Sequence, residues 1–174
     1  MKTNIALFGF MGVGKSEVGR TLADKLGMTF TDLDNEIAER AGKPIATIFE
    51  EDGEAMFRER ERAIVEEASA RNGQVIACGG GAVLDDVNLR NLRESSRMIL
   101  LTADPNTILS RVGSTDGPRP LLYVEERLER IRELLSARNP SYYKAADLTI
   151  DTSHRTPEQV ADEIIRLLRG TEER

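Results

Sequence analysis

The sequence of 174 residues has no tryptophan, few aromatic residues, a single cysteine and a single histidine. One cysteine, Cys78, rules out an internal disulfide, and one histidine, His154, rules out a histidine-rich metal site. Both scarcities favour a reducing cytoplasm as the location. Because aromatic residues make up only 5% of the chain, we expect an aliphatic core, which suits buried parallel strands covered by helices.

Long apolar runs and basic tracts are also lacking. No segment has the length of apolar sequence that spans a bilayer, so we expect no membrane partner. The apolar stretch 5–13 is interrupted by glycines and precedes no small-residue cleavage site, so we expect no signal peptide. A net charge of −6 without clustered Lys and Arg argues against nucleic acid as a partner. A small-molecule ligand remains, and a few local arginines suffice to hold an anionic one.

Short apolar runs alternate with helix-like segments along the chain. The runs lie at 5–8, 28–33, 75–78, 98–101 and 148–150. Since each is almost continuously apolar, we expect strands buried on both faces, as in an α/β fold with a parallel sheet. The length of the chain, with no repeat or low-complexity tract, predicts one domain over 1–174.

Capping residues predict several helix boundaries. The segment Thr156 to Gln159 offers a capping hydroxyl, a first-turn proline and a capping-box glutamine, and Gly170 is expected to end that helix. Another helix is predicted to open at Asp104-Pro105. A long charged helix is predicted to end at 137–139, before Pro140.

The strongest local signal is the segment Gly9 to Ser16, which matches G-x-x-x-x-G-K-[ST] directly after the first predicted strand. Its glycines allow backbone N–H groups to surround phosphate oxygens at a helix N-terminus. Lys15 is then predicted to reach the β- and γ-phosphates of ATP, and the Ser16 hydroxyl to bind Mg²⁺. The predicted nucleotide contacts in this segment are Gly12, Val13, Gly14, Lys15, Ser16 and Glu17.

Two aspartates, Asp32 and Asp34, follow the second predicted strand, at the edge of the sheet where ligands bind in α/β folds. Asp32 is a candidate to act on Mg²⁺ through water, and Asp34 is a candidate to accept a substrate hydroxyl, as hydrogen-bond acceptor or base. Taken alone, the pair fits a helix N-cap beside a solvated aspartate equally well.

These motifs and several others resemble the shikimate kinases along nearly the whole chain. The matching stretches are Gly9 to Ser16, Asp32 to Asp34, Phe57 to Glu61, Gly79 to Gly81, Arg119 to Leu122, and Arg138 with Pro140 and Tyr142. The resemblance implies a three-layer P-loop kinase fold with a five-stranded parallel sheet of order 2-3-1-4-5. It also implies transfer of the γ-phosphoryl group of ATP to the 3-hydroxyl of shikimate, in chorismate and aromatic amino-acid biosynthesis.

The resemblance implies an acceptor site as well. Arg58 and Arg138 are implied to hold the shikimate carboxylate, a task that suits the two-pronged guanidinium, with Glu61 orienting Arg58. Without the resemblance, the spacing of charges around Arg58 is typical of a solvated helix face. The residues implied to bind shikimate are Asp34, Arg58, Gly80, Gly81 and Arg138.

Further expectations concern the substrate-binding subdomain, a lid loop, the adenine contact and the oligomeric state. A substrate-binding subdomain is expected over about 34–61. The turn-rich segment after the fourth strand is expected to form a lid loop over about 112–122, and closure would bring Arg119 to the transferring phosphoryl group. Arg155 is implied to lie against adenine, although an exposed turn arginine fits the sequence nearly as well. We expect a monomer.

Alternatives remain at this point. A gluconate kinase or a nucleoside monophosphate kinase would share the phosphate loop but not the whole set of motifs. A slow nucleotide-dependent switch is disfavoured, because no guanine-specifying N-K-x-D motif is present.

Two single residues need separate comment. Glu17 departs from the shikimate kinases, where threonine is frequent at this position. Cys78 is predicted to be a small buried residue and not a nucleophile.

Overall fold

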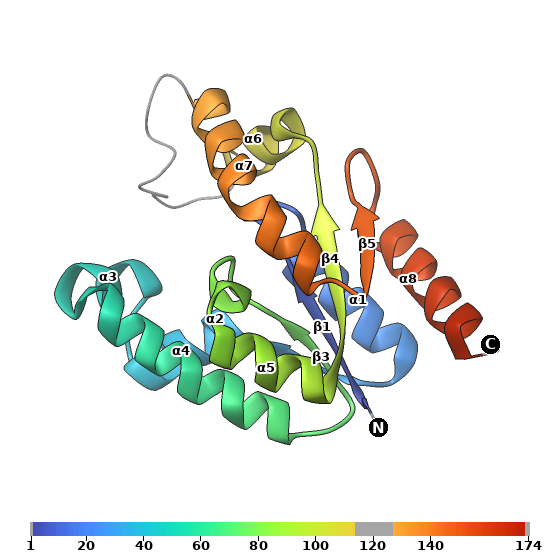
Figure 1. The fold of residues 1–174 in the computed structure, drawn as a ribbon, viewed down its shortest axis with the longest axis horizontal. Coiled ribbons are helices and arrows are strands. Elements are labelled where there is room, and N and C mark those ends of the chain that lie inside the picture. Colours follow the sequence, from blue (N-terminus) through green and yellow to red (C-terminus); the bar gives the residue numbers. More distant parts are fainter. Residues whose placement is uncertain (1, 114–126, 173–174) are drawn as a thin grey trace.

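A central parallel sheet organises the protein, whose computed structural model describes residues 2–113 and 127–172 (Figure 1). In that part of the chain five strands form one sheet in the order β2-β3-β1-β4-β5, all parallel. The strands are β1 (Asn4–Phe8), β2 (Thr29–Asp32), β3 (Gln74–Ala77), β4 (Ser96–Thr102) and β5 (Leu148–Asp151). The predicted strand positions, the α/β class and the strand order are confirmed.

Helices cover both faces of the sheet and complete three layers. They are α1 (Lys15–Leu26), α2 (Leu33–Ala41), α3 (Ile45–Glu51), α4 (Gly53–Ala70), the 3₁₀ turn η1 (Ala82–Leu84), α5 (Asp86–Ser95), α6 (Pro105–Gly113), α7 (Arg127–Ala145) and α8 (Pro157–Glu172). Helices α4, α5 and α7 lie on one face of the sheet, while α1 and α8 pack together on the other (Figure 1).

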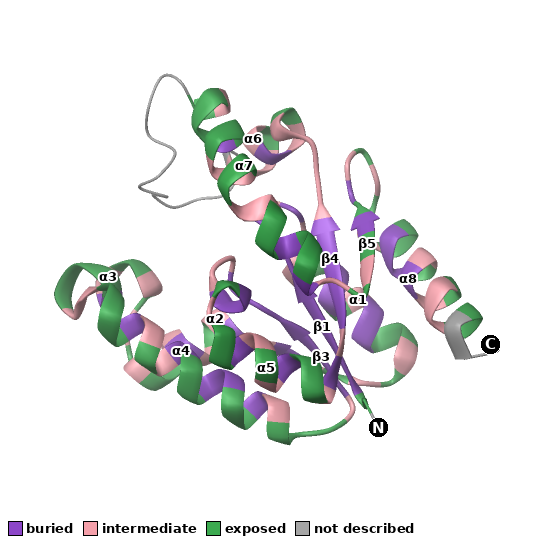
Figure 2. Cartoon of the chain, in the orientation of Figure 1, coloured by how far each residue is buried: buried purple, intermediate pink, exposed green. Residues whose placement is uncertain are grey.

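The core lies between these layers and is aliphatic, as the composition predicts. Every residue of β1 and of β3 is buried, whereas the outer faces of the helices are exposed (Figure 2). Burying one large aliphatic side chain contributes about 1.5–3 kcal/mol. Because its central strands are packed on both faces, the sheet is rigid. The loops and helices that follow the carboxyl ends of the strands are therefore held in fixed positions.

The predicted caps are confirmed at two helices. At the start of α8, the Gln159 N–H donates to Thr156 Oγ1 over 3.2 Å, and the Thr156 N–H donates to Gln159 Oε1 over 3.0 Å. This reciprocal pair is a capping box. At α6, Asp104 Oδ1 accepts from the Thr107 N–H over 2.9 Å.

Two predicted helix ends are wrong. Helix α7 does not stop before Pro140 but continues to Ala145, and the residues past the proline include the buried Tyr142. Packing of that last stretch outweighs the hydrogen bond that proline removes. Helix α8 also continues through Gly170 to Glu172, because one helical glycine weakens a helix by only about 1 kcal/mol without ending it.

Two further findings bear on function. No helix in the described ranges is both long and apolar enough to cross a membrane.

Cys78 is buried directly after β3, and burial raises the pKa of its thiol to about 12. The thiol is therefore protonated at neutral pH, which confirms the prediction of a small buried residue.

Candidate functional site

A cleft of about 610 Å³ lies at the carboxyl edge of the sheet, a size that suits small-molecule ligands. It is lined by the loops that follow β1 and β3, and by α1, α2, α3, α4, α6 and α7. Among the residues predicted from sequence, those that line it are Gly12, Gly14, Lys15, Ser16, Glu17, Asp34, Arg58, Gly80, Gly81 and Arg138.

The other predicted residues lie elsewhere. Val13 is a buried residue of the phosphate loop, and Asp32 is hydrogen-bonded to Ser16 but does not line the cleft. Arg155 follows β5 and donates to the carbonyls of Asp151 and Gln159, so its contact with adenine stays a prediction. Arg119 and the rest of the predicted lid from residue 114 onward lie outside the described residues, while Val112 and Gly113 belong to α6.

The phosphate loop has the backbone that its glycines predict. Gly9 and Gly12 have φ values of 144° and 75°, and Gly14 caps the N-terminus of α1 with a φ of 94°. A Cβ at Gly9 would lie 2.3 Å from the Leu101 carbonyl oxygen, so no larger residue fits. Lys15 Nζ donates to the carbonyls of Gly9 and Phe10 over 2.8 and 2.9 Å. The loop thus presents a helix N-terminus and an ammonium group together, which suits an anion.

Beside the loop, Ser16 and Asp32 form an oxygen-rich pair. Ser16 Oγ donates to Asp32 Oδ2 over 2.7 Å, and Asp32 Oδ1 accepts from the Asn35 N–H over 3.2 Å as the N-cap of α2. The N-cap alternative for Asp32 is therefore confirmed, and the same carboxylate still faces the loop serine. Glu17 is exposed in the first turn of α1, at the rim of the cleft.

The donors at this point fit Mg²⁺. A hydroxyl and a carboxylate are hard oxygen ligands, and Mg²⁺ is commonly held by one or two such groups together with substrate phosphates and water. Within the described residues no cluster of three or more His, Cys, Asp or Glu side chains is placed to hold a metal. Ser16 and Asp32 supply two such oxygen ligands beside the phosphate loop.

Three consecutive glycines after β3 bring the acceptor-side residues together. A Cβ at Gly79 would lie 2.7 Å from Asp34 Oδ1, and one at Gly81 would lie 2.7 Å from both Arg58 Nη atoms. A Cβ at Gly80 would lie 3.4 Å from Arg138 Nη1. Each glycine therefore makes room for a different functional side chain, so this segment is more than a plain turn.

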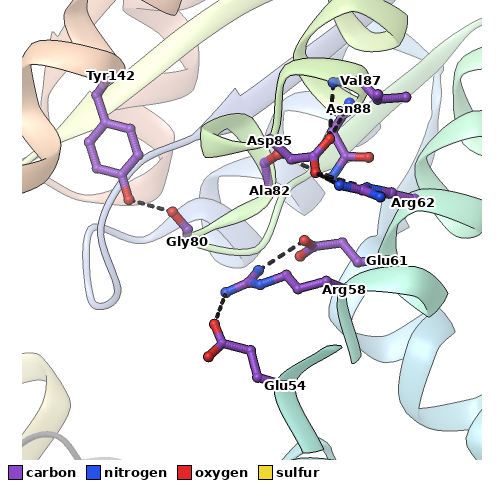
Figure 3. Close-up of polar contacts among 10 residues, drawn as sticks. All are labelled: Glu54, Arg58, Glu61, Arg62, Gly80, Ala82, Asp85, Val87, Asn88 and Tyr142. Atoms are coloured by element: carbon purple, nitrogen blue, oxygen red, sulfur yellow. Dashed lines mark hydrogen bonds and ion pairs between the residues drawn. The ribbon is translucent and has the colours of Figure 1, made fainter. Parts of the chain in front are cut away.

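Arg58 is paired with the buried carboxylate of Glu61, as the family resemblance implies. Its Nη1 donates to Glu61 Oε1 over 2.9 Å, and the Glu54 carboxylate lies 3.7 Å from Nη2 (Figure 3). Burial raises the pKa of Glu61, Arg58 opposes that rise, and the charge of Asp34 adds to it. The neighbouring Arg62 donates to Asp85, and neither residue lines the cleft.

Sequence reasoning missed Arg111, which also lines the cleft. Its Nη2 donates to the Thr152 carbonyl over 2.7 Å, and its Nη1 donates to Thr152 Oγ1 and to the Gly12 carbonyl. Arg111 thereby ties the end of β5 to the phosphate loop. In the sequence it is one basic residue near a helix end, and no local pattern separates it from a surface arginine.

Comparison with known proteins agrees with this geometry. A family model described as shikimate kinase matches residues 11–169. The chain is 48% identical to the shikimate kinase of Caldanaerobacter subterraneus subsp. tengcongensis over 94% of each sequence. It is 45% identical to that of Thermodesulfovibrio yellowstonii, over 94% of this chain and 93% of the relative. The structure of a shikimate kinase from Acinetobacter baumannii in complex with shikimate superposes with a TM-score of 0.93 at 37% identity, covering 100% of this chain and 97% of the other. With the family model spanning most of the sequence and such relatives along nearly all of it, the chain belongs to the shikimate kinase family.

Proposed function

We propose that the cleft transfers the γ-phosphoryl group of ATP to the 3-hydroxyl of shikimate, giving ADP and shikimate 3-phosphate. Family membership makes the chain an enzyme that phosphorylates shikimate in aromatic biosynthesis. The observation that supports separate ATP and shikimate sites is that a phosphate loop, two arginines and an aspartate line one cleft. Phosphoryl transfer requires such positioning and charge stabilisation above all.

The phosphate loop forms the nucleotide half of the proposed site. Its backbone N–H groups and Lys15 bind the phosphates, so that negative charge developing on the transferring group meets a fixed positive one. Ser16 and Asp32 would hold Mg²⁺, which neutralises charge on the β- and γ-phosphates when bound. Arg119, in the segment outside the described residues, is proposed from the sequence to supply further positive charge when a lid over about 112–122 closes.

The acceptor half lies across the cleft, and we propose that its subdomain extends over about 34–61. Arg58 and Arg138 bind the acceptor carboxylate, while Asp34 accepts the hydrogen bond of the reacting hydroxyl. As the bond from the hydroxyl oxygen to the γ-phosphorus forms, the bond to the bridging oxygen of ADP breaks. The hydroxyl proton passes to Asp34, whose Oδ1 is kept close to the loop after β3 by the small size of Gly79.

One chain supplies both halves of this cleft, which supports the proposal of a monomer. A reducing cytoplasm also stays a proposal, resting on the single cysteine of the sequence.

Replacing Asp34 with asparagine tests the acceptor half. We expect kcat with shikimate to fall by about 10²–10³-fold, because asparagine keeps the shape but cannot take the hydroxyl proton. The KM for MgATP is expected to stay within twofold, since the phosphate loop is untouched. Steady-state kinetics give kcat and KM for D34N and for the control Glu39→Gln, an exposed position on the same helix. A kcat for D34N equal to that of the wild type would remove Asp34 from the mechanism.

The buried Glu61 predicts a pH dependence of shikimate binding. Because the pKa of Glu61 is raised, the carboxylate takes up a proton as the pH falls through that raised value, and Arg58 then loses its charged partner. We expect the KM for shikimate to rise as the pH is lowered from 8 through that raised pKa, before an ordinary carboxylate such as that of the substrate takes up a proton.

The variant Glu61→Gln separates this effect from other titrations. Its KM for shikimate should be raised about fivefold at pH 8 and should change little with pH, because glutamine carries no titrating group. The matched control is Glu59→Gln, an exposed position on the same helix. If E61Q kept the pH profile of the wild type, another group would be responsible.

A further inference from the structure

Tyr142 connects two parts of the acceptor site that are far apart in the sequence. It lies on α7, one helical turn after Arg138, and its side chain is almost completely buried. Its hydroxyl donates a hydrogen bond to the carbonyl of Gly80, 62 residues earlier (Figure 3). The ring also packs edge-on against Phe8 at the end of β1, with 6.1 Å between ring centroids. The phenol is therefore fixed in direction, and its hydroxyl reaches a specific backbone atom.

The Gly80 carbonyl determines the orientation of the next peptide. In a trans peptide, the carbonyl of one residue and the N–H of the following residue point in opposite directions, and the described chain contains no cis peptide. Holding the Gly80 carbonyl toward α7 therefore fixes the direction of the Gly81 N–H. Glycine has the widest backbone freedom, so this segment needs an external restraint if its N–H is to be preorganised.

Arg138 is the second group that Tyr142 contacts. Burial raises the pKa of Tyr142, while the charge of Arg138 and a side-chain hydrogen bond with it oppose that rise. Arg138 Nη1 and the Tyr142 hydroxyl also lie 3.4 and 3.9 Å from the position that a Cβ at Gly80 would take. A tyrosine hydroxyl is both donor and acceptor, so it is able to accept from Arg138 while it donates to Gly80. The Arg138 guanidinium also lies over the Phe10 ring, 5.6 Å from its centroid, and lines the cleft.

The rest of the loop after β3 has its own anchors. Asn88 Nδ2 donates to the Ala82 carbonyl over 3.2 Å, and Arg62 donates to Asp85, which caps α5 (Figure 3). These contacts come from α4 and α5 and do not involve Tyr142. Removing the Tyr142 hydroxyl should therefore release the Gly80 peptide and Arg138 while the remainder of the loop stays folded.

We propose that Tyr142 is a positioning residue for the acceptor: its hydroxyl holds the Gly80–Gly81 peptide and the Arg138 guanidinium in one arrangement that binds the acceptor carboxylate and ring. The proposal rests on the proposed function of this cleft. It also gives a reason for the continuation of α7 past Pro140, because only the last turns of the helix bring Tyr142 to Gly80.

The variant Tyr142→Phe tests this, since it removes the hydroxyl and keeps the ring that packs on Phe8. We expect the KM for shikimate and the calorimetric Kd of shikimate to rise about tenfold, with the KM for MgATP within twofold of the wild type. Tyr143→Phe is the matched control, because Tyr143 is the next residue and is 54% exposed. It should leave all three constants unchanged.

A purely structural role would give a different pattern. If Y142F lowered the melting temperature and weakened MgATP and shikimate alike, or left the shikimate constants at wild-type values, the proposal would be wrong. Absence of shikimate-dependent turnover in the wild-type enzyme would instead contradict the proposed function itself, so the two failures are distinguishable.

A double-mutant cycle with Arg138→Lys tests the coupling. Lysine keeps the charge but loses the planar guanidinium that Tyr142 orients. We expect Y142F to raise the shikimate KM by about threefold or less in the R138K background, because the two changes disrupt one arrangement. A tenfold effect in both backgrounds, which is simple additivity, would overturn the link between Tyr142 and Arg138.

Discussion

Replacing Lys15 with alanine is expected to lower kcat/KM for MgATP by about 10³-fold or more, the largest effect of any single change in the cleft. The Lys15 ammonium lies at the mouth of the phosphate loop and donates to the carbonyls of Gly9 and Phe10. Those carbonyls hold it in the place where the β- and γ-phosphates would arrive. Without it, the charge that develops during transfer loses its nearest fixed cation.

The change should act on chemistry more than on folding. Lys15 is partly exposed and belongs to the phosphate loop, outside the hydrophobic core, so we expect the melting temperature of K15A to stay close to that of the wild type. Lys25→Ala is the control, because Lys25 lies on the same helix and, within the described residues, pairs with the exposed Asp162. Retention of more than a tenth of wild-type kcat/KM in K15A would contradict the assigned role.

Replacing Arg58 with alanine is expected to lower kcat/KM for shikimate by about 10²-fold or more, with little change in the KM for MgATP. A guanidinium that binds a carboxylate through charge-assisted hydrogen bonds contributes about 1.5–3 kcal/mol for each bond. Arg62→Ala is the matched control, one turn further along α4, because Arg62 pairs with Asp85 outside the cleft. It should leave the KM for shikimate unchanged.

The same variant predicts a separate effect on stability. Loss of Arg58 leaves Glu61 buried without its cation, so the pKa of Glu61 in the folded protein lies further above its unfolded value. The folded state then favours the protonated form, and R58A should lose stability as the pH rises through that raised pKa. The loss should approach about 3 kcal/mol at alkaline pH.

Denaturant unfolding of R58A at pH 6 and pH 8.5 measures this loss. The double variant Arg58→Ala/Glu61→Gln should recover stability at pH 8.5 but not activity, since glutamine needs no cation while the substrate carboxylate still lacks its partner. Recovery of activity in the double variant would show that Arg58 acts only through Glu61 and does not bind shikimate.

The strands and the phosphate loop were predictable because their causes are local. Strands buried on both faces need short continuous apolar runs, and the run 5–8 is followed directly by the glycines that let a backbone surround phosphate. The capping box at Thr156 and Gln159 likewise depends on residues three apart. The strand order, in contrast, came from family resemblance, since no local pattern specifies which strands are neighbours.

The parts that sequence reasoning missed depend on distant contacts. Pro140 is a sound local signal for a helix end, but burial of Tyr142 against the loop after β3 keeps α7 helical beyond it. Arg111 bonds to Thr152 and Gly12, 41 and 99 residues away, so its place in the cleft has no local signature. For Arg58, charge spacing alone favoured a solvated helix face, and the assignment to the acceptor site with Glu61 as partner came from family resemblance; the structure places the buried Glu61 beside it.

The most direct test of the account is ADP release with MgATP, measured with shikimate and in parallel with gluconate, with AMP and without an acceptor. Wild-type enzyme should release ADP only when shikimate is present, and Arg58→Ala should abolish most of that release while Arg62→Ala retains it. Release that is equal without an acceptor, or that requires gluconate or AMP, would contradict the assignment of this cleft to shikimate.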